Sequence, residues 1–152
     1  AYSDPAHTIA DALRYFDEAL TADPDHQWSR LYRACCLLDT RRWREAYEAY
    51  ELVDAAFLVG PISWRYELLL EQKAYCLMRA GSLDAAAEEF SILLSRWEKC
   101  PEPAEFLLGT YIVEAARGAL RARLWDRLSA FAKQQNWDWF SHLPEGNKRK
   151  EN

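Results

Sequence analysis

The chain carries a pattern of residues that repeats along its length, and this repeat restricts the possible fold more than any other feature. When the sequence is shifted by about 40 positions, segment 33–38 (RACCLL) falls on segment 73–78 (KAYCLM). A second pattern consists of an alanine, an aromatic residue four positions later, and a small or apolar residue three positions after that. It occurs at Ala12, Phe16 and Ala19, at Ala46, Tyr50 and Val53, and at Ala86, Phe90 and Leu93.

This spacing predicts helices that pack closely against one another. Residues four positions apart lie on the same face of a helix, so each alanine shares a face with the aromatic residue that follows it. The small side chain lets two helices approach, and the ring fills the space beside it. A single helical hairpin cannot bury such a face alone, so we expect the hairpins to stack.

The composition and the breaker residues agree with an all-α fold. Half of the residues are hydrophobic, Ala and Leu dominate among them, and only five residues are glycines, which favours helices over strands. Capping and breaker residues predict about seven helices, roughly at 5–23, 25–39, 42–58, 62–80, 83–98, 104–117 and 119–135. Gly118 leaves open whether the last two are a hairpin or one long kinked helix. We expect one domain of stacked antiparallel hairpins over residues 1–143 and a mobile polar tail over residues 144–152.

The repeat resembles the tetratricopeptide repeat, a helix–turn–helix unit of about 34 residues. The residues that carry the resemblance are Ala34, Leu37, Trp43, Ala46 and Tyr50 in one unit, Ala74, Leu77, Gly81, Leu83, Ala86 and Phe90 in the next, and Ala12, Phe16, Ala19 and Pro24 in an earlier unit that lacks its first helix. Arg41 stands where this family usually has Gly, and the residues around 60–65 exceed the standard period. The resemblance covers roughly residues 6–98 and decays after Pro103.

The resemblance implies a binding scaffold whose first helices line a concave groove for a peptide or a partner helix. By repeat position, the groove residues are Trp28, Leu31, Cys35 and Leu38 in one unit and Leu68, Glu71, Tyr75 and Arg79 in the next. The alternative for each position is burial beneath neighbouring helices. Some members of the family bind chaperone C-termini through a Lys and Asn clamp. This clamp is not expected here, because its positions hold Leu31, Cys35, Glu71 and Tyr75.

Other classes of function have little support in the sequence. The net charge of −5 argues against a nucleic-acid partner, and no apolar run is long enough for a membrane span. The cysteines, at 35, 36, 76 and 100, lack metal-binding or redox spacing, and we expect free thiols in a reducing compartment such as the cytoplasm. The three histidines are far apart, and no nucleophile or phosphate-loop motif occurs, so we expect no catalytic residue, metal or cofactor.

The last third of the chain contains two further features. Trp137, Trp139 and Phe140 predict either a cap over the last hairpin or an exposed contact for a partner. The arginines at 117, 121, 123 and 127 predict either a docking surface for an acidic partner or local ion pairs with Glu114 and Asp126.

The sequence therefore predicts a non-catalytic scaffold that binds a protein or a peptide. The first alternative is a self-associating unit, a homo-oligomer whose end hairpins stack on another copy. The second alternative is an enzyme or a small-ligand sensor with a helical pocket.

Overall fold

The computed structural model describes residues 5–58, 63–101 and 110–137. These residues form seven α-helices and one short 3-10 helix and contain no strand, which confirms the all-α prediction. The elements are α1 (Pro5–Ala22), α2 (Gln27–Asp39), α3 (Trp43–Glu51), η1 (Ala55–Leu58), α4 (Ser63–Arg79), α5 (Leu83–Lys99), α7 (Thr110–Arg117) and α8 (Arg121–Gln134).

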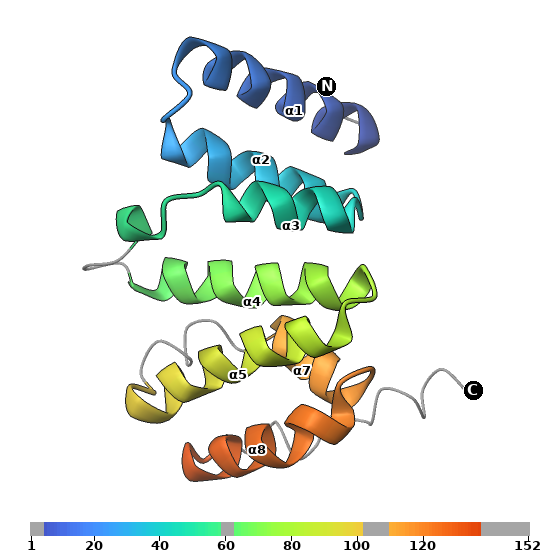
Figure 1. The fold of residues 1–152 in the computed structure, drawn as a ribbon, viewed down its shortest axis with the longest axis vertical. Coiled ribbons are helices and arrows are strands. Elements are labelled where there is room, and N and C mark those ends of the chain that lie inside the picture. Colours follow the sequence, from blue (N-terminus) through green and yellow to red (C-terminus); the bar gives the residue numbers. More distant parts are fainter. Residues whose placement is uncertain (1–4, 59–62, 102–109, 138–152) are drawn as a thin grey trace.

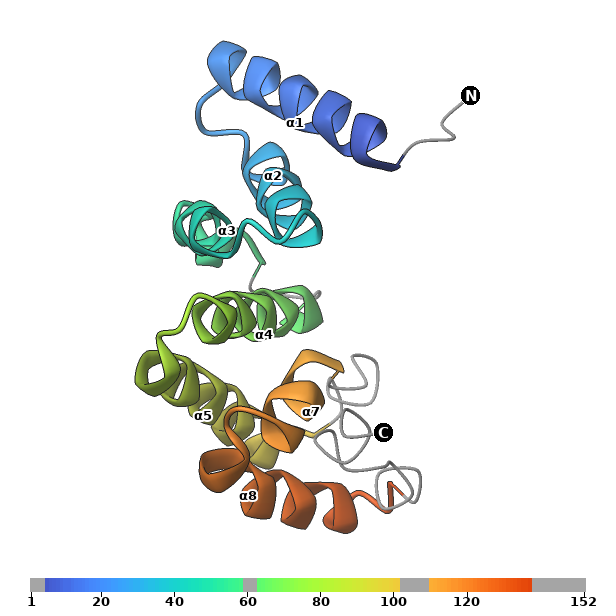
Figure 2. The same ribbon diagram turned by 90° about the vertical axis from the view of Figure 1, so that its right-hand side faces the viewer.

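The helices are stacked along the long axis of the molecule, from α1 at one end to α8 at the other (Figure 1). Each helix from α1 to α5 packs on the next one in the chain, α7 packs on both α4 and α8, and α8 also packs on α5. Figure 2 shows α2 and α7 on one side of the stack and α3 and α5 on the other, with α4 between them. Helix α4 therefore has packed neighbours on both sides of the stack.

The repeated pattern forms the core, as its spacing predicts. Its alanines at the helix contacts have no exposed surface: Ala34, Ala46, Ala74 and Ala86. The rings of Tyr50 and Phe90, which follow two of these alanines, are 1% and 0% exposed. In α1 the same pattern is only partly buried, and no residue between positions 8 and 22 belongs to the core. The stack is therefore well packed at its centre and loosely packed at α1.

Helix α3 ends at Glu51, so the prediction that it continues to Leu58 was wrong. Side chains of α2 bind the backbone that follows α3: Arg30 Nη1 donates to the carbonyl of Leu52 at 2.7 Å, and Gln27 Oε1 accepts the N–H of Asp54 at 2.8 Å. These bonds hold the chain in a turn, because they satisfy backbone groups that a longer helix would use. The turn leads into η1.

Helices α7 and α8 are separate and form a hairpin. The N–H of Leu120 and the N–H of Gly118 both donate to the carbonyl of Ala115, at 2.9 and 3.2 Å. This tight turn ends α7 and lets α8 fold back against it. The predicted start of this region at residue 104 lies outside the described residues.

The α2–α3 and α4–α5 hairpins share one turn geometry. The N–H of Arg42 donates to the carbonyl of Leu37, and the N–H of Ser82 donates to the carbonyl of Leu77, both at 2.9 Å. This arrangement requires a left-handed residue just before the donor. Gly81 occupies that position with φ 95°, whereas in the other hairpin it is Arg41 with φ 61°. An arginine there is strained, because its Cβ crowds the following carbonyl oxygen.

Replacing Arg41 by Gly is therefore expected to stabilise the protein by about 0.5–1 kcal/mol, since relief of the strain exceeds the extra chain entropy of Gly. Replacing Gly81 by Ala is expected to destabilise it by about 1 kcal/mol, although nothing lies within 4 Å of the added Cβ. Urea unfolding of both variants measures these changes. A destabilised Arg41→Gly protein would show that the side chain of Arg41 contributes more than its backbone strain costs.

Candidate interaction face

The structure divides the eight residues predicted to line a groove into two groups. Four are buried in the core: Leu31, Leu38, Glu71 and Tyr75. The other four are partly or largely exposed: Trp28, Cys35, Leu68 and Arg79. Only the second group is accessible to a partner in this structure.

Helix α7 accounts for the burial of Glu71 and Tyr75. The backbone N–H of Ile112 donates to Glu71 Oε2 at 2.9 Å. The ring centre of Tyr75 lies 4.8 Å from that of Tyr111, the second residue of α7. The repeat positions do not reveal this cover, because α7 lies in the region where the repeat match decays.

Five residues of α2, η1 and α4 form what we call the Arg65 cluster: Trp28, Tyr32, Phe57, Trp64 and Arg65. The indole of Trp28 stacks on Tyr32 with 5.7 Å between ring centres and meets Phe57 edge-on at 4.7 Å. The guanidinium carbon of Arg65 lies 5.0 Å from the centre of the Trp28 ring and 4.8 Å from that of Trp64. These cation–π contacts restrain the guanidinium. Tyr32 is 40% exposed, so part of this aromatic surface is open.

A second group, the Arg79 cluster, lies at the other end of α4: Trp43, Tyr75, Arg79, Tyr111 and Glu114. The guanidinium carbon of Arg79 lies 4.6 Å from the centre of the Trp43 ring. Its Nη1 donates to the hydroxyl of Tyr75 at 3.1 Å, and that hydroxyl donates to the carboxylate of Glu114. Arg79 also forms an ion pair with Glu114 at 3.9 Å. The charge of Arg79 is therefore balanced within the cluster.

A polar contact between α2, α3 and α4 lies beside these clusters. The hydroxyl of Tyr50 donates to Gln72 Oε1 at 2.9 Å and lies 3.6 Å from Cys35 Sγ. Burial raises the pKa of the Cys35 thiol and raises the pKa of Cys76 to about 12. A protonated thiol is a poor nucleophile. Cys76 lies in the hydrophobic core, and Cys35 packs against it.

The two clusters lie on one side of α4. Arg65 and Arg79 are fourteen positions apart, which is about 21 Å along the axis and within about 40° of the same direction around it. Leu68 and Gln72, three and seven positions after Arg65, fall on the same stripe, and Cys35 lies 4.0 Å from Gln72 Oε1. We call the two clusters together with Cys35, Leu68 and Gln72 the α4 face.

The sequence did not identify Tyr32, Trp64 or Arg65 as part of this face. Trp64 and Arg65 fall in the segment that exceeds the repeat period, so no repeat position pointed to them. Tyr32 follows Trp28 by four positions, a spacing that places both on one side of a helix. That spacing was the available signal for Tyr32.

Glu71 is a buried carboxylate that faces the start of α7. Only 1% of the residue is exposed. Loss of water around the carboxylate raises its pKa to about 7, although the backbone N–H groups of Ile112 and Tyr111 act in the opposite direction. The same N–H groups favour a negative charge at this helix terminus. Glu71 therefore caps α7, and the free-energy cost of burying its ionised carboxylate grows as pH rises.

A second buried carboxylate joins α4 to α5. Glu67 is 2% exposed, and its Oε1 accepts a hydrogen bond at 3.0 Å from the indole N–H of Trp97, which is fully buried. Its other oxygen lies 3.4 Å from the guanidinium of Arg96. Each contact helps to offset the cost of burying the carboxylate.

The end of the described chain closes over α8. The N–H of Trp137 donates to the carbonyl of Ala132 at 3.0 Å, and its ring meets Phe131 edge-on at 5.5 Å. Trp139, Phe140 and the tail 144–152 lie outside the described residues. A partner contact at these aromatic residues stays a prediction.

Two arginines of α8 pair with α5 and not with Glu114 or Asp126, the partners of the local ion pairs that were one of the two alternatives from the sequence. The pairs are Arg123 with Asp84 and Arg127 with Glu98, at 2.6 and 2.8 Å. The local-pair alternative was wrong for these two residues, because α8 packs on α5 and brings acidic side chains that are distant in sequence close to them.

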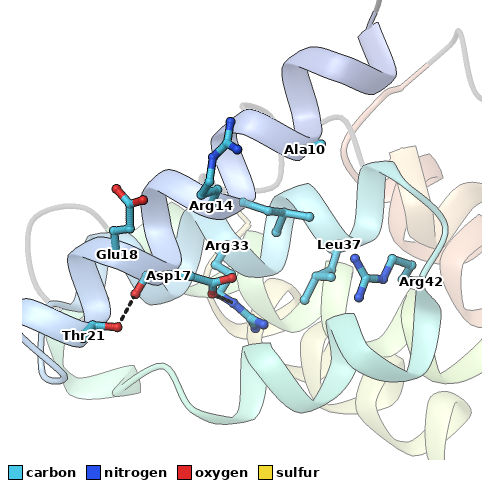
Figure 3. Close-up of a pocket in the computed structure, with 9 residues that line it drawn as sticks. Ala10, Arg14, Asp17, Glu18, Thr21, Arg33, Leu37 and Arg42 are labelled. Carbon is cyan, nitrogen blue, oxygen red and sulfur yellow. Dashed lines mark hydrogen bonds and ion pairs between the residues drawn. The ribbon is translucent and has the colours of Figure 1, made fainter.

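A cavity of about 410 Å³ lies between α1 and the α2–α3 hairpin (Figure 3). Its lining consists of Ala10, Leu13, Arg14, Asp17, Glu18, Thr21, Arg33, Leu37 and Arg42. The three lining arginines pair with carboxylates: Arg14 with Asp11, Arg33 with Asp17 and Arg42 with Glu45. Figure 3 shows Arg33 and Asp17 directed toward each other and the hydroxyl of Thr21 bonded to the backbone of Asp17. The positive charges in this cavity are thus already matched.

Comparison of the chain with models of protein families, with curated proteins and with solved structures gives no match. None of the described helices combines the length and the apolar character that crossing a membrane requires. In the described ranges, no three His, Cys, Asp or Glu side chains lie close enough together to hold a metal ion.

Replacing Glu71 by Gln is expected to stabilise the fold increasingly as pH rises from about 5 to about 8. The folded-state pKa of about 7 lies above the ordinary value of 4.5, so folding takes up a proton between these values. The contribution of Glu71 to the stability of the wild-type protein therefore falls as pH rises through this window, by at most about 3 kcal/mol. The Gln amide stays neutral and its oxygen can still accept the N–H of Ile112.

Urea unfolding of both proteins across this pH range measures the effect, because the two proteins differ by one titratable side chain. Glu88→Gln, an exposed change on α5, is the control and is expected to show no such trend. A difference between Glu71→Gln and wild type that does not vary with pH contradicts the assignment.

Proposed function

We propose that the chain is a protein-interaction module that binds a peptide or a partner helix on the α4 face. The observation that carries this proposal is the pair of aromatic and arginine clusters at the two ends of one side of α4. Aromatic residues and arginine are the types that contribute most to interface hot spots. Leu68 lies on the same stripe and adds apolar surface between them.

The length of the α4 face suits such an occupant. The separation of about 21 Å between Arg65 and Arg79 equals about six residues of extended chain or about fourteen residues of helix. Both are common in the recognition of peptides by folded domains. The cavity beside α1 gives less support to an enzyme or a ligand sensor, because its arginines are already paired.

A reducing compartment such as the cytoplasm is the proposed place of action. All four cysteines are free. Cys76 is fully buried within the core, where a free thiol packs as a small apolar group.

Photo-reactive residues introduced at Tyr32 and at Leu68 are expected to crosslink the same partner segment, whereas one at Ile92 is expected to crosslink none of it. Ile92 is 53% exposed on α5 and provides the matched apolar control. A synthetic peptide of the captured segment is expected to bind Tyr32→Ala and Arg79→Ala about tenfold or more weakly. Ile92→Ala is expected to bind as tightly as wild type, and fluorescence anisotropy measures all four proteins.

Equal crosslinking from Ile92, or equal affinity of all variants, would place the partner elsewhere and reject this proposal. Circular dichroism of each variant confirms that a loss of affinity is not a loss of fold. Tyr32 is preferred to Tyr75 for this test, because Tyr75 is buried.

Self-association is a second candidate, and α1 is the observation that favours it. The apolar residues of α1 are only partly covered: Ile9, Ala12, Leu13, Phe16, Ala19 and Leu20. Tyr15 beside them is 65% exposed. Another copy stacked on α1 would complete the burial of this helix, as neighbouring units do in helical repeats.

If this second candidate is right, the solution mass of the chain should rise with concentration, and Tyr15→Glu should return it to that of a monomer. Ile92→Glu, an equivalent change on α5, should leave the association intact. Light scattering over a wide concentration range measures the mass. A monomer at every concentration removes this candidate and leaves the α4 face proposal untouched.

A further inference from the structure

Arg65 is restrained by aromatic rings but has no polar partner in the described part of the chain. Its guanidinium rests against Trp28 and Trp64, and no described carboxylate, hydroxyl or carbonyl binds it. The residue is only partly exposed. Within the described part of the chain, water is therefore the acceptor left for the N–H groups of Arg65.

This state distinguishes Arg65 from most arginines of the molecule. The described arginines that pair with a carboxylate are Arg14, Arg30, Arg33, Arg42, Arg79, Arg96, Arg123 and Arg127. Arg79, at the other end of the α4 face, is neutralised by Glu114. Arg65 is thus the charge on this face that an incoming group can satisfy.

The contacts of Arg65 prepare it for an anion. The rings of Trp28 and Trp64 contact the cation without offering an oxygen acceptor, so the N–H groups of Arg65 keep their capacity to donate to an anion. Two parallel N–H donors on one edge of a guanidinium match the two oxygens of a carboxylate. Because the rings already restrain the side chain, binding loses less conformational entropy than it would with a mobile arginine.

We propose that Arg65 binds the side-chain carboxylate of an Asp or Glu in a partner peptide, and that an apolar residue near this Asp or Glu packs on Trp28 and Tyr32. This inference rests on the proposed function and specifies the partner of the α4 face. The ring of Trp28 links the two subsites, since it contacts both Arg65 at 5.0 Å and Tyr32 at 5.7 Å.

These distances limit the spacing within the partner. The guanidinium and the ring of Tyr32 are separated by no more than the sum of the two contacts through Trp28. About three residues of extended chain span that length. The partner is therefore expected to carry an aromatic or aliphatic residue within about three positions of its acidic residue.

Charge favours a carboxylate over a more highly charged anion. Arg65 is the single cation of its cluster, and one guanidinium balances one carboxylate. The net charge of −5 opposes the approach of a polyanion. A peptide with one acidic residue at the contact fits this surface better than a phosphopeptide.

Selection of random peptides displayed on phage, with the full chain as bait, tests the proposal. The selected peptides are expected to carry Asp or Glu within about three positions of an apolar residue. Arg65→Gln is expected to lower the affinity for a selected peptide by about tenfold or more, because a charged hydrogen-bonded pair is lost. Arg65→Lys is expected to weaken it less, since it keeps the charge but not the paired donors. Arg123→Gln on α8 is the matched control and is expected to bind normally.

Replacing the Asp or Glu of the selected peptide by Asn or Gln completes a double-mutant cycle. The exchange is expected to weaken binding to the wild-type chain about as much as Arg65→Gln does, and to change little in the Arg65→Gln protein. Isothermal titration calorimetry measures the four affinities, and circular dichroism verifies the fold of each variant. Stronger binding at higher ionic strength contradicts an ion pair at this site.

The outcomes separate this inference from the proposed function. Suppose that the selected peptides lack acidic residues, bind Arg65→Gln normally and lose affinity for Tyr32→Ala. This result would overturn the assignment of a carboxylate to Arg65, while the α4 face would stand as the interaction face. A phosphoserine peptide that binds about tenfold more tightly than its Glu counterpart also overturns the carboxylate assignment. If the selected peptides bind Tyr32→Ala, Arg79→Ala and Arg65→Gln with the affinity of the wild-type chain, both proposals are overturned.

Discussion

The close approach of helices at four buried alanines is the contact on which the rest of the structure depends. Ala34 on α2, Ala46 on α3, Ala74 on α4 and Ala86 on α5 have no exposed surface, and α2 packs on α3 as α4 packs on α5. A larger side chain at any of them would force the helices apart, because protein interiors have no room for added methyl groups. The position of α4 between the two sides of the stack follows from these contacts, and the arginine clusters at its ends are positioned with it.

Polar contacts then fix how the apolar surfaces meet. Glu67 and Glu71 lie on one helix, and each binds a different neighbour: Glu67 binds Trp97 of α5, and Glu71 binds the first turn of α7. Apolar surfaces alone tolerate small sliding and rotation, whereas a buried carboxylate must keep its donors. The two carboxylates thus cost stability and, in return, define the register of α5 and α7 on α4.

The sequence was sufficient to predict the all-α fold, since the pattern around Ala46 and Ala86 has the period of a helix and recurs along the chain. It was insufficient wherever residues distant in sequence decide the outcome. The end of α3 depends on Gln27 in α2, which no local signal around Asp54 reveals. The burial of Tyr75 depends on α7, where the repeat becomes weak. The α4 face could be predicted only in part, because Arg65 lies in the segment that breaks the period.

The partial burial of α1 has a consequence for the way the molecule opens. Helix α1 packs mainly on α2, and none of its residues from Thr8 to Ala22 lies in the core. A terminal unit with one neighbour can detach without disturbing the centre of the stack. Amide hydrogens of α1 should therefore exchange through local opening, while those of α4 should await global unfolding. The cavity lined by α1 exists only while this helix is docked on α2. A ligand or partner that bound in the cavity would therefore bind only the docked conformation.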